Sequence, residues 1–422
     1  MKLYNTLSRQ LEELPPPPGP IRMYFCGPTV YARAHVGNAI PFVLPMWLRR
    51  WLRPRGYRVT FVHNITDIDD KILDAPGPSA EVAAEAAEWY LQDIADLGLG
   101  MPDEIPRATL SIRQIIAFIE RLVATDHAYA VGGDVYFRVA SDPEYGRLSG
   151  QRPDEVAEQE PNPLKDDPRD FALWKGTKPG EDVSFDSPWG PGRPGWHIEC
   201  STMAEEAFGP VFEIHGGGLD LVFPHHENEL AQSRALGHEF AHIWMHNGML
   251  RFTGEKMSKS VGNVATLRDV LDEYGRETLL LFFMTGQWRK PLDFSEQTMA
   301  QAAAQVESLR NTFRSASEPV GDWSAFEAAL EDDFNTPEAL ALMHGWRDHE
   351  LLRRGLDVFG LASLAEEETA PAELADLAER RREARDAKDF AGADRLRDEI
   401  AAAGWEVRDV AEPPGYRLVR RS

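Results

Sequence analysis

The sequence predicts an α/β protein built on a parallel sheet, and three observations support this prediction. Residues 21–26 have the apolar character of a short buried strand, which ends at the turn signal of Gly27 and Pro28. A helical pattern follows from about residue 37 to 53, and residues 57–63 form a second candidate strand. Strand, turn, helix and strand in this order make the opening unit of a parallel sheet.

The segments that follow predict an interruption of this sheet. Helical patterns occupy roughly residues 81–98 and 111–125. Residues from about 128 to 196 are rich in Pro, Gly and Asp and contain short strand candidates, which indicates an insertion. Residues 211–214 and 243–246 are then expected to resume the sheet.

The C-terminal part of the sequence predicts helices. Amphipathic patterns dominate from residue 261 to about 361, and residues 366–371 have the composition of a linker. A charged helix or helix pair is expected over 374–400, and an extended basic stretch follows at 416–421.

The composition is that of an ordinary globular protein. With 422 residues the chain is too long for a single compact core, and about two to four domains are expected. The net charge of −24 argues mildly against a nucleic-acid partner, although an acidic protein can still carry one basic face. No segment resembles a signal peptide or a membrane span, and only two cysteines occur, so we expect a reducing cytoplasm and no membrane association.

A metal site is the chemical feature on which the interpretation of the chain depends. If a helix starts after Pro224, His225 and Glu229 lie at positions i and i+4 and point from the same face. They supply half of a tetrahedral shell, and the two cysteines, Cys26 and Cys200, are the ligands that zinc would favour next. The sequence therefore predicts that these four side chains bind one Zn²⁺. A disulfide between the cysteines is an alternative that a reducing compartment disfavours.

Two short strings suit the phosphates of a nucleotide. Residues 35–38, His-Val-Gly-Asn, lie between a strand and a helix, where donor side chains and a glycine allow close approach of a phosphate. Residues 256–260, Lys-Met-Ser-Lys-Ser, place two lysines in a short loop that can clamp a polyphosphate. For either string alone, a helix cap or a surface loop is the alternative. Together and in this order, the two strings indicate a nucleotide site far more specifically than either string does alone.

The two strings resemble the paired ATP-binding signatures of class I aminoacyl-tRNA synthetases, and further motifs narrow the resemblance to the cysteinyl-tRNA synthetase family. These motifs cover nearly the whole chain and lie at residues 26–31, 64–70, 195–200, 215–218, 224–229 and 332–337. The resemblance implies a Rossmann-like catalytic domain over residues 1–245, which includes the insertion at about 128–196. It also implies three C-terminal parts: a stem-contact region over 246–305, a shortened helical bundle over 306–365 and an anticodon-binding module over 366–422.

The same resemblance implies roles for individual residues. The family's zinc ligands fall on the four side chains singled out above. The expected catalytic residues are His35, Asn38, Lys256 and Lys259, and Gly37 joins them in binding ATP, whose phosphates carry Mg²⁺. The residues expected around the amino-acid substrate are Gly27, Thr66, Trp196, His215 and Asp220. A core aromatic is the alternative for Trp196, and a turn cap is the alternative for Asp220.

The implied reaction has two steps. The carboxylate of L-cysteine attacks the α-phosphorus of ATP to give cysteinyl-adenylate and pyrophosphate, and a terminal ribose hydroxyl of tRNA(Cys) then takes the cysteinyl group. Neither step needs a side-chain nucleophile, so catalysis is expected from positioning and charge stabilisation. Zinc would accept the substrate thiolate as a further ligand, and a purely structural zinc is the alternative. We expect a monomer without an obligatory protein partner.

Several positions depart from the family pattern. Ala32 and Ile40 replace an acidic residue and an arginine near the first ATP signature. Leu418 stands where a tryptophan is usual, and Tyr416 is a nearby aromatic that could stack on an anticodon base. The basic residues within 416–421 are candidates for phosphate contacts.

Two other functions compete with this prediction. The cysteine ligase of mycothiol biosynthesis resembles these synthetases, but it lacks the anticodon-binding region and a glutamate at the position of Glu229. A catalytically silent tRNA-binding paralogue is the other alternative. The presence of both ATP signatures and of all four expected zinc ligands speaks against it.

Overall fold

The computed structural model describes residues 1–151, 161–253, 265–366, 370–410 and 414–420. The chain divides into two compact units, Met1–Leu361 and Ala362–Ser422. Within the described ranges, no helix is both long enough and apolar enough to cross a bilayer.

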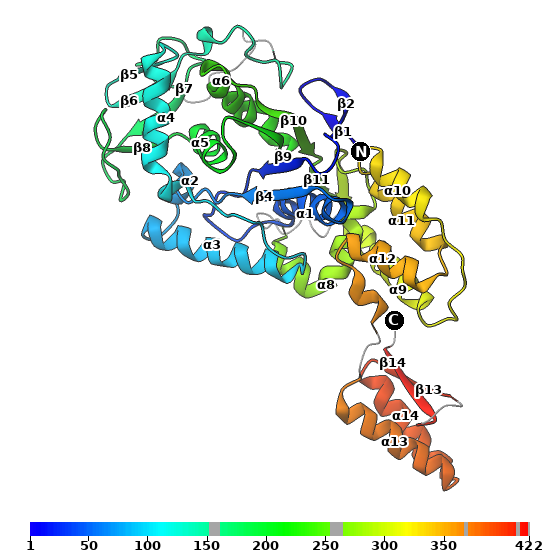
Figure 1. The fold of residues 1–422 in the computed structure, drawn as a ribbon. Coiled ribbons are helices and arrows are strands. Elements are labelled where there is room, and N and C mark those ends of the chain that lie inside the picture. Colours follow the sequence, from blue (N-terminus) through cyan, green and yellow to red (C-terminus); the bar gives the residue numbers. More distant parts are fainter. Residues whose placement is uncertain (152–160, 254–264, 367–369, 411–413, 421–422) are drawn as a thin grey trace. The chain divides into compact units, whose positions relative to one another are not determined.

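The first unit is organised around a four-stranded sheet (Figure 1). Its strands, in spatial order, are β10 (Phe240–Asn247), β9 (Val211–Gly218), β3 (Pro20–Phe25) and β4 (Arg58–His63). All neighbouring strands run parallel, and they correspond to the four strands expected from the sequence. The prediction of a parallel α/β fold is therefore confirmed.

Helices cover both faces of this sheet (Figure 1). On one face, α1 (Ile40–Leu52) packs against β3, β4 and β9, and it is buried over most of its length, which is why its sequence is apolar almost all round. On the other face lie α5 (Trp196–Phe208) and α6 (Glu227–Ala235). Parallel strands end at the same edge of a sheet, so the segments that follow the strands are brought together there.

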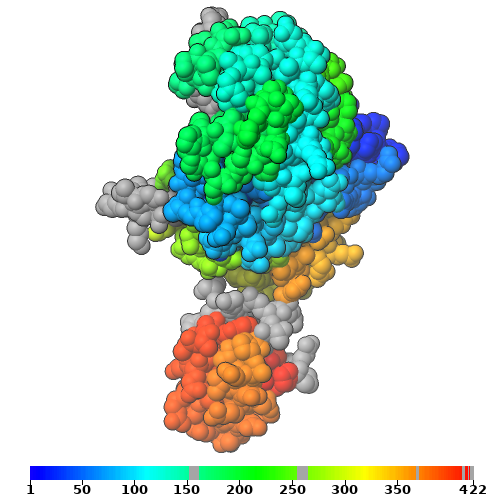
Figure 2. Space-filling model, turned by 90° about the vertical axis from the view of Figure 1, so that its left-hand side faces the viewer, coloured from blue at the N-terminus to red at the C-terminus, as the bar shows by residue number. Residues whose placement is uncertain are grey.

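The segment predicted as an insertion forms a second sheet. Its four antiparallel strands are β5 (Ala128–Val131), β6 (Asp134–Phe137), β7 (Phe171–Gly176) and β8 (Gly192–Pro194). Together with α4 (Ile112–Ala124), these strands enclose an apolar core that includes Ile198 of α5. Figure 2 shows the insertion, in teal and green, as one continuous surface with the cyan residues that precede it. Since Ile198 lies two residues before Cys200, the insertion is anchored on the helix that carries this cysteine.

The remaining elements of the first unit surround this framework. Its N-terminal hairpin consists of β1 (Lys2–Asn5) and β2 (Gln10–Glu13), and β1 lies beside β10. A short parallel pair joins β11 (Leu250–Phe252) to β12 (Leu292–Phe294). The other helices are α2 (Asp70–Leu73), α3 (Ser79–Asp96), α8 (Leu267–Met284), α9 (Glu296–Thr312), α10 (Trp323–Glu331), α11 (Thr336–Gly345) and α12 (His349–Val358).

The second unit has its own small core. It contains α13 (Ala372–Asp386), α14 (Phe390–Ala402) and an antiparallel hairpin of β13 (Trp405–Asp409) and β14 (Tyr416–Arg420). Leu418 and Tyr416 pack against the buried residues of these helices and of β13, and the hydroxyl of Tyr416 donates to the carbonyl oxygen of Ala375 at 3.2 Å. Both side chains therefore contribute to the fold of the unit itself.

A buried histidine lies at the end of β4. Nδ1 of His63 is 2.9 Å from the carbonyl oxygen of Phe25, and Nε2 is 2.6 Å from the hydroxyl of Tyr90. A neutral ring satisfies both contacts, because Nδ1–H donates and Nε2 accepts. Burial lowers the pKa of His63 from 6.5 to about 4, although the hydrogen bond to Phe25 opposes this shift.

Stability is therefore expected to fall as the pH drops below neutrality. His63 takes up a proton near pH 6.5 in the unfolded chain but only near pH 4 in the folded chain. The part of the free energy of unfolding that depends on neutral His63 is therefore complete above pH 6.5 and is lost as the pH falls towards 4. The expected loss in the free energy of unfolding is ~3 kcal/mol. Urea unfolding at several pH values should show it. His63→Phe should remove this part of the pH dependence, whereas Tyr90→Phe should keep it. If the free energy of unfolding changed equally with pH in the two variants, His63 would not be its source.

Candidate active site

The carboxyl edge of the parallel sheet gathers the predicted site residues. Cys26 directly follows β3, and residues 216–218 end β9. Cys200 lies in the second turn of α5, whereas His225 and Glu229 lie one turn apart where α6 begins. Because β3 and β9 are neighbours in the sheet, these segments meet at one place.

The four predicted zinc ligands lie together. Their donor atoms are all within 4.8 Å of one another, and all four side chains are buried. Sγ of Cys26 lies 3.6 Å from Nε2 of His225 and 3.7 Å from Oε1 of Glu229. Zinc bonds of about 2.3 Å to sulfur and 2.0 Å to nitrogen separate two donors of a tetrahedron by roughly 3.5 Å. The arrangement therefore fits a zinc ion. Both cysteines are free thiols, so they do not form the alternative disulfide.

The two thiols differ in how readily they ionise. Burial raises the pKa of Cys26 well above its usual value, and the neighbouring Cys200 raises it further. A hydrogen bond with Cys26 lowers the pKa of Cys200 to about 6, although burial opposes this change. One thiolate is therefore favoured at neutral pH and the second is not. A divalent cation would supply the charge that two adjacent thiolates need.

The carboxylate and the imidazole of the cluster stabilise each other's charged forms. Burial raises the pKa of Glu229, but His215 and His225 outweigh burial and lower it to about 2. Burial likewise lowers the pKa of His225, but Glu229 and Cys200 outweigh it and raise the value to about 10. The carboxylate thus requires a positive partner, and a metal ion could replace the imidazolium proton in that role.

A second set of donors overlaps the first. Donor atoms of Cys26, His215, His226 and Glu229 also lie within 4.8 Å of one another. Nε2 of His226 is 3.4 Å from Sγ of Cys26, and Nε2 of His215 is 2.9 Å from Oε2 of Glu229. From the sequence, His215 is expected in the substrate pocket, and no role is expected for His226. The pair of adjacent histidines was the signal that could have indicated the second set.

Hydrogen bonds behind these histidines orient their rings. Nδ1 of His226 lies 2.7 Å from Nε2 of His246, whose Nδ1 lies 2.8 Å from Oγ1 of Thr6. Nδ1 of His215 lies 3.1 Å from the carbonyl oxygen of Tyr24. Outer partners of this kind fix a metal-binding ring, so that Nε2 is directed towards the other donors.

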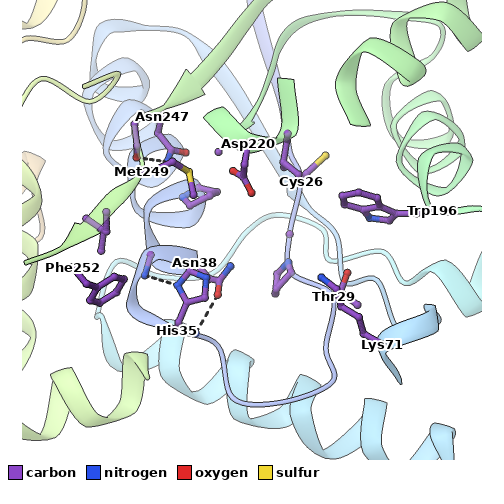
Figure 3. A pocket seen from close by; sticks show the side chains of 18 residues that line it. Cys26, Thr29, His35, Asn38, Lys71, Trp196, Asp220, Asn247, Met249 and Phe252 are labelled. Atoms are coloured by element: carbon purple, nitrogen blue, oxygen red, sulfur yellow. Dashed lines mark hydrogen bonds between the residues drawn. The ribbon is translucent and has the colours of Figure 1, made fainter. Parts of the chain in front are cut away.

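A cavity of about 200 Å³ opens beside the cluster (Figure 3). Among the residues that line it are Cys26, Gly27, His35, Gly37, Asn38, Lys71, Trp196, Asp220, Asn247, Met249 and Phe252. Figure 3 shows Trp196 and Lys71 on one side, and Met249 and Phe252 on the other. The sulfur-bearing cluster and the first predicted nucleotide string therefore border the same space.

The first nucleotide string is held by its own hydrogen bonds. Nδ1 of His35 accepts from the backbone N–H of Gly37 at 3.1 Å, and Oδ1 of Asn38 accepts from the backbone N–H of His35 at 3.1 Å. Nδ1 of His35 and Oδ1 of Asn38 therefore cap the short helix that follows, as the alternative interpretation of this string expects. Nε2 of His35 and Nδ2 of Asn38 are the polar atoms left to meet a ligand in the cavity.

The predicted substrate residues divide into two groups. Gly27, Trp196 and Asp220 line the cavity, whereas Thr66 and His215 are buried and do not line it. A Cβ atom on Gly27 would lie 1.7 Å from the carbonyl oxygen of Asn64, so only glycine fits there. Lys256 and Lys259 lie outside the described residues.

Trp196 and Asp220 occupy positions that distinguish a pocket residue from a core aromatic or a turn cap. The ring of Trp196 stacks on His225, with centroids 4.2 Å apart, and it is only half-buried. It is a pocket residue rather than a core aromatic. Asp220 lies inside a short 3₁₀ turn, Leu219–Leu221, that Gly218 precedes, and its exposed side chain points into the cavity (Figure 3). It therefore does not cap that turn.

A second cavity, of about 260 Å³, shares Trp196 and Lys71 with the first. Three basic residues from the insertion line it: Lys165, Arg169 and Lys175. Aromatic and acidic side chains also contribute, among them Tyr145, Phe171, Asp70 and Asp170. Sequence reasoning missed this cavity because its walls come from segments that are far apart in the chain.

Comparison with known proteins agrees with this geometry. A family model described as the catalytic domain of class I tRNA synthetases (C) matches residues 15–304, and a DALR domain model matches residues 325–349. The fold is shared with Mycobacterium tuberculosis methionyl-tRNA synthetase in complex with methionyl-adenylate, with a TM-score of 0.59 and 15% identity over 82% of this chain and 88% of that chain. The fold and the matched segments define a class I tRNA synthetase.

Curated relatives give the family. The cysteine–tRNA ligase of Alkalilimnicola ehrlichii is 45% identical over 99% of each chain, and that of Halorhodospira halophila is 44% identical over the whole of both chains. The chain belongs to the cysteine–tRNA ligase family, which confirms the resemblance. These alignments span 460 positions although the chain has 422 residues, so the relatives contain residues without a counterpart here.

We predict that one zinc ion binds per chain and that the two cysteines differ in importance. Cys26 belongs to both donor sets and Cys200 to one, so Cys26→Ala should weaken zinc binding more than Cys200→Ala does. The loss for Cys26→Ala should be about 100-fold or more, since a binding free energy of about 10–16 kcal/mol is shared among four ligands. Competition with a chromophoric chelator measures both affinities. Equal losses would contradict a role for the second donor set.

Proposed function

We propose that this protein activates L-cysteine with ATP and transfers the cysteinyl group to tRNA(Cys), with zinc binding the substrate thiolate. The observation that carries the proposal is the position of Cys26. Its sulfur belongs to the buried donor cluster, and the residue also lines the cavity that His35 and Asn38 border. An amino acid bound through its sulfur at this wall would extend its carboxylate into the same space as a nucleotide phosphate.

The four buried donors would hold the metal. When bound there, zinc would supply a soft centre that prefers a thiolate to the hydroxyl of serine. A pocket that relies on shape separates near-isosteres by only roughly 10²-fold, whereas translation needs about 10⁴ or more. The donor set of Cys26, Cys200, His225 and Glu229 supports discrimination through sulfur without a separate editing domain.

The nucleotide would occupy the opposite wall of the cavity. Nε2 of His35 and Nδ2 of Asn38 would donate to the phosphates, while Gly37 allows close approach of the backbone. Lys256 and Lys259, with Mg²⁺ on the phosphates, would stabilise the charge that develops on pyrophosphate. Asp220 would bind the α-ammonium group of cysteine, because its carboxylate is directed into the cavity between the two walls.

The second cavity would receive the 3′ end of the tRNA. It combines three basic side chains with the half-buried ring of Trp196, and this combination suits a phosphate and a stacked base. Arg169 pairs with Asp167 and Lys175 pairs with Asp70, so a phosphate would compete with these carboxylates. Because Trp196 borders both cavities, a ribose placed there lies next to the site of the adenylate. The basic side chains are accompanied in the cavity wall by Asp69, Asp70 and Asp170, so any attraction for a phosphate is local.

The C-terminal unit would bind the anticodon. Three arginines of α13 are engaged in ion pairs, since Arg381 and Arg385 pair with Asp409 and Arg382 pairs with Glu379. They therefore support the unit's own fold more than a phosphate contact. Phe390, at the start of α14, is 64% exposed and is an aromatic surface on which a base could stack. The unit would act within a monomer in the cytoplasm, where the two free thiols remain reduced.

Cysteine-dependent exchange of pyrophosphate into ATP tests the first step. We expect exchange with cysteine and a rate with serine that is at least about 10⁴-fold lower. Chelation of zinc should abolish exchange with cysteine. Transfer of cysteine to tRNA(Cys), but not to an amino sugar, should complete the reaction. An absence of exchange would favour a silent tRNA-binding paralogue, and transfer to the amino sugar would favour the mycothiol-pathway ligase.

Arg169→Ala tests the role of the second cavity. We expect KM for tRNA(Cys) in aminoacylation to rise about tenfold, because a charge-assisted contact to a phosphate is lost. Exchange of pyrophosphate should be unchanged, since Arg169 lines only the second of the two cavities. Arg147→Ala is a matched control, because Arg147 is an exposed arginine of the same region that pairs with Glu144 and lines neither cavity. Equal effects of the two substitutions would refute the assignment.

A further inference from the structure

The segment that carries the first ATP signature borders the nucleotide cavity, and it is bonded through its backbone to the segment just before α8. The N–H of Val36 donates to the carbonyl oxygen of Ala265 at 3.1 Å, and the N–H of Leu267 donates to that of Ala34 at 2.8 Å. These bonds form an antiparallel bridge between His35 and Thr266. The first ATP signature is therefore joined to the segment from which α8 starts.

A single buried carboxylate lies behind this bridge. Asp93, in the last turn of α3, is 0% exposed. Nη1 of Arg33, two residues before His35, lies 3.1 Å from Oδ1 and 3.3 Å from Oδ2 of Asp93. Nη1 of Arg268, in the first turn of α8, lies 3.6 Å from Oδ1 of Asp93. One carboxylate thus faces one arginine from each of the two bridged segments.

The neighbours of Asp93 hold the two arginines in place. Arg268 also contacts Asp96 at 2.6 Å and Asp272 at 2.7 Å, while the guanidinium of Arg33 lies 5.3 Å from the centre of the Trp89 ring. Burial raises the pKa of Asp93, and the two arginines oppose that rise, so each helps to keep the carboxylate charged. A buried carboxylate needs such partners, because a buried charge without compensation is strongly unfavourable.

We propose that Asp93 is a positioning residue for ATP activation. It fixes Arg33 and Arg268 together, and through the backbone bridge it sets the position of His35 at the wall of the nucleotide cavity. Asp93 itself lines neither of the two cavities, so it acts through the segments that it holds. The proposal rests on the proposed function, because the geometry that it controls is that of the ATP signature.

Arginine substitutions test this role in the full-length, zinc-loaded protein. Arg33→Met and Arg268→Met should each reduce kcat/KM for ATP in pyrophosphate exchange by about 10- to 100-fold, the cost of a displacement of about 1 Å at a reacting centre. KM for cysteine and the zinc content should stay unchanged, since the metal cluster makes no contact with Asp93 in the described structure. Arg33→Lys should recover part of the loss, because it retains the positive charge.

The double variant separates coupled from independent effects. If both arginines act through Asp93, Arg33→Met with Arg268→Met should cost little more than the larger single substitution. The proposal would be overturned if the double variant lost kcat/KM for ATP by the product of the two single losses. It would also be overturned if the substitutions impaired the use of ATP and of cysteine equally. Glu213→Gln is the control for a lost ion pair, because Glu213 binds Arg22 at 2.8 Å near the opposite end of β3 and β9. It should lower thermal stability without a selective effect on ATP.

The unaltered protein distinguishes this proposal from the proposed function. If it shows no cysteine-dependent exchange, the proposed function fails, and the role of Asp93 is then decided by calorimetry with ATP. In that measurement the arginine variants must bind ATP more weakly than the unaltered protein. Equal affinities would overturn the positioning role.

Discussion

The site depends on the burial of four ionisable side chains at one point. Two thiols, an imidazole and a carboxylate lose their hydration when Cys26, Cys200, His225 and Glu229 come together at the carboxyl edge of the sheet. A buried charge without a partner is strongly unfavourable, so such a cluster requires compensation. The charged His225 compensates both Glu229 and the thiolate of Cys200, and a second thiolate at Cys26 would need a further positive charge. A divalent ion satisfies all four groups, which is why the cluster is evidence for a metal.

Close backbone approach makes that convergence possible. A Cβ atom on Gly216 would lie 2.3 Å from the ring of Phe25, and one on Gly27 would meet the backbone of Asn64. Larger residues would force β3, β9 and the segment after β4 apart. The glycines therefore hold Cys26 at the depth where His225 and Glu229 can meet it. Because the surrounding segments pack closely, a substrate would reach the four donors from the cavity that Cys26 lines.

The features that could be predicted from the sequence are those that depend on local residue patterns. The four strands of the parallel sheet are short apolar runs bounded by turn signals, and they were found at nearly the correct positions. The donor quartet could be predicted because the chain has only two cysteines and because His225 and Glu229 lie four residues apart on an expected helix. By contrast, the place of His226 in the second donor set depends on its ring orientation, which is set by His246 in β10 and by Thr6 just after β1. The second cavity likewise depends on how the insertion packs, and no spacing in the sequence encodes this.

Trp196 links the parts of the site that the proposed reaction must coordinate. Its ring stacks on His225 and also lines both cavities, so one rigid side chain contacts the metal cluster, the nucleotide space and the proposed path of the tRNA end. It begins the helix whose second turn carries Cys200, and that helix is anchored in the core of the insertion through Ile198. A shift of the insertion would therefore move the ring and Cys200 together. If the second cavity receives the tRNA end as proposed, its binding is mechanically coupled to the donor cluster through this helix.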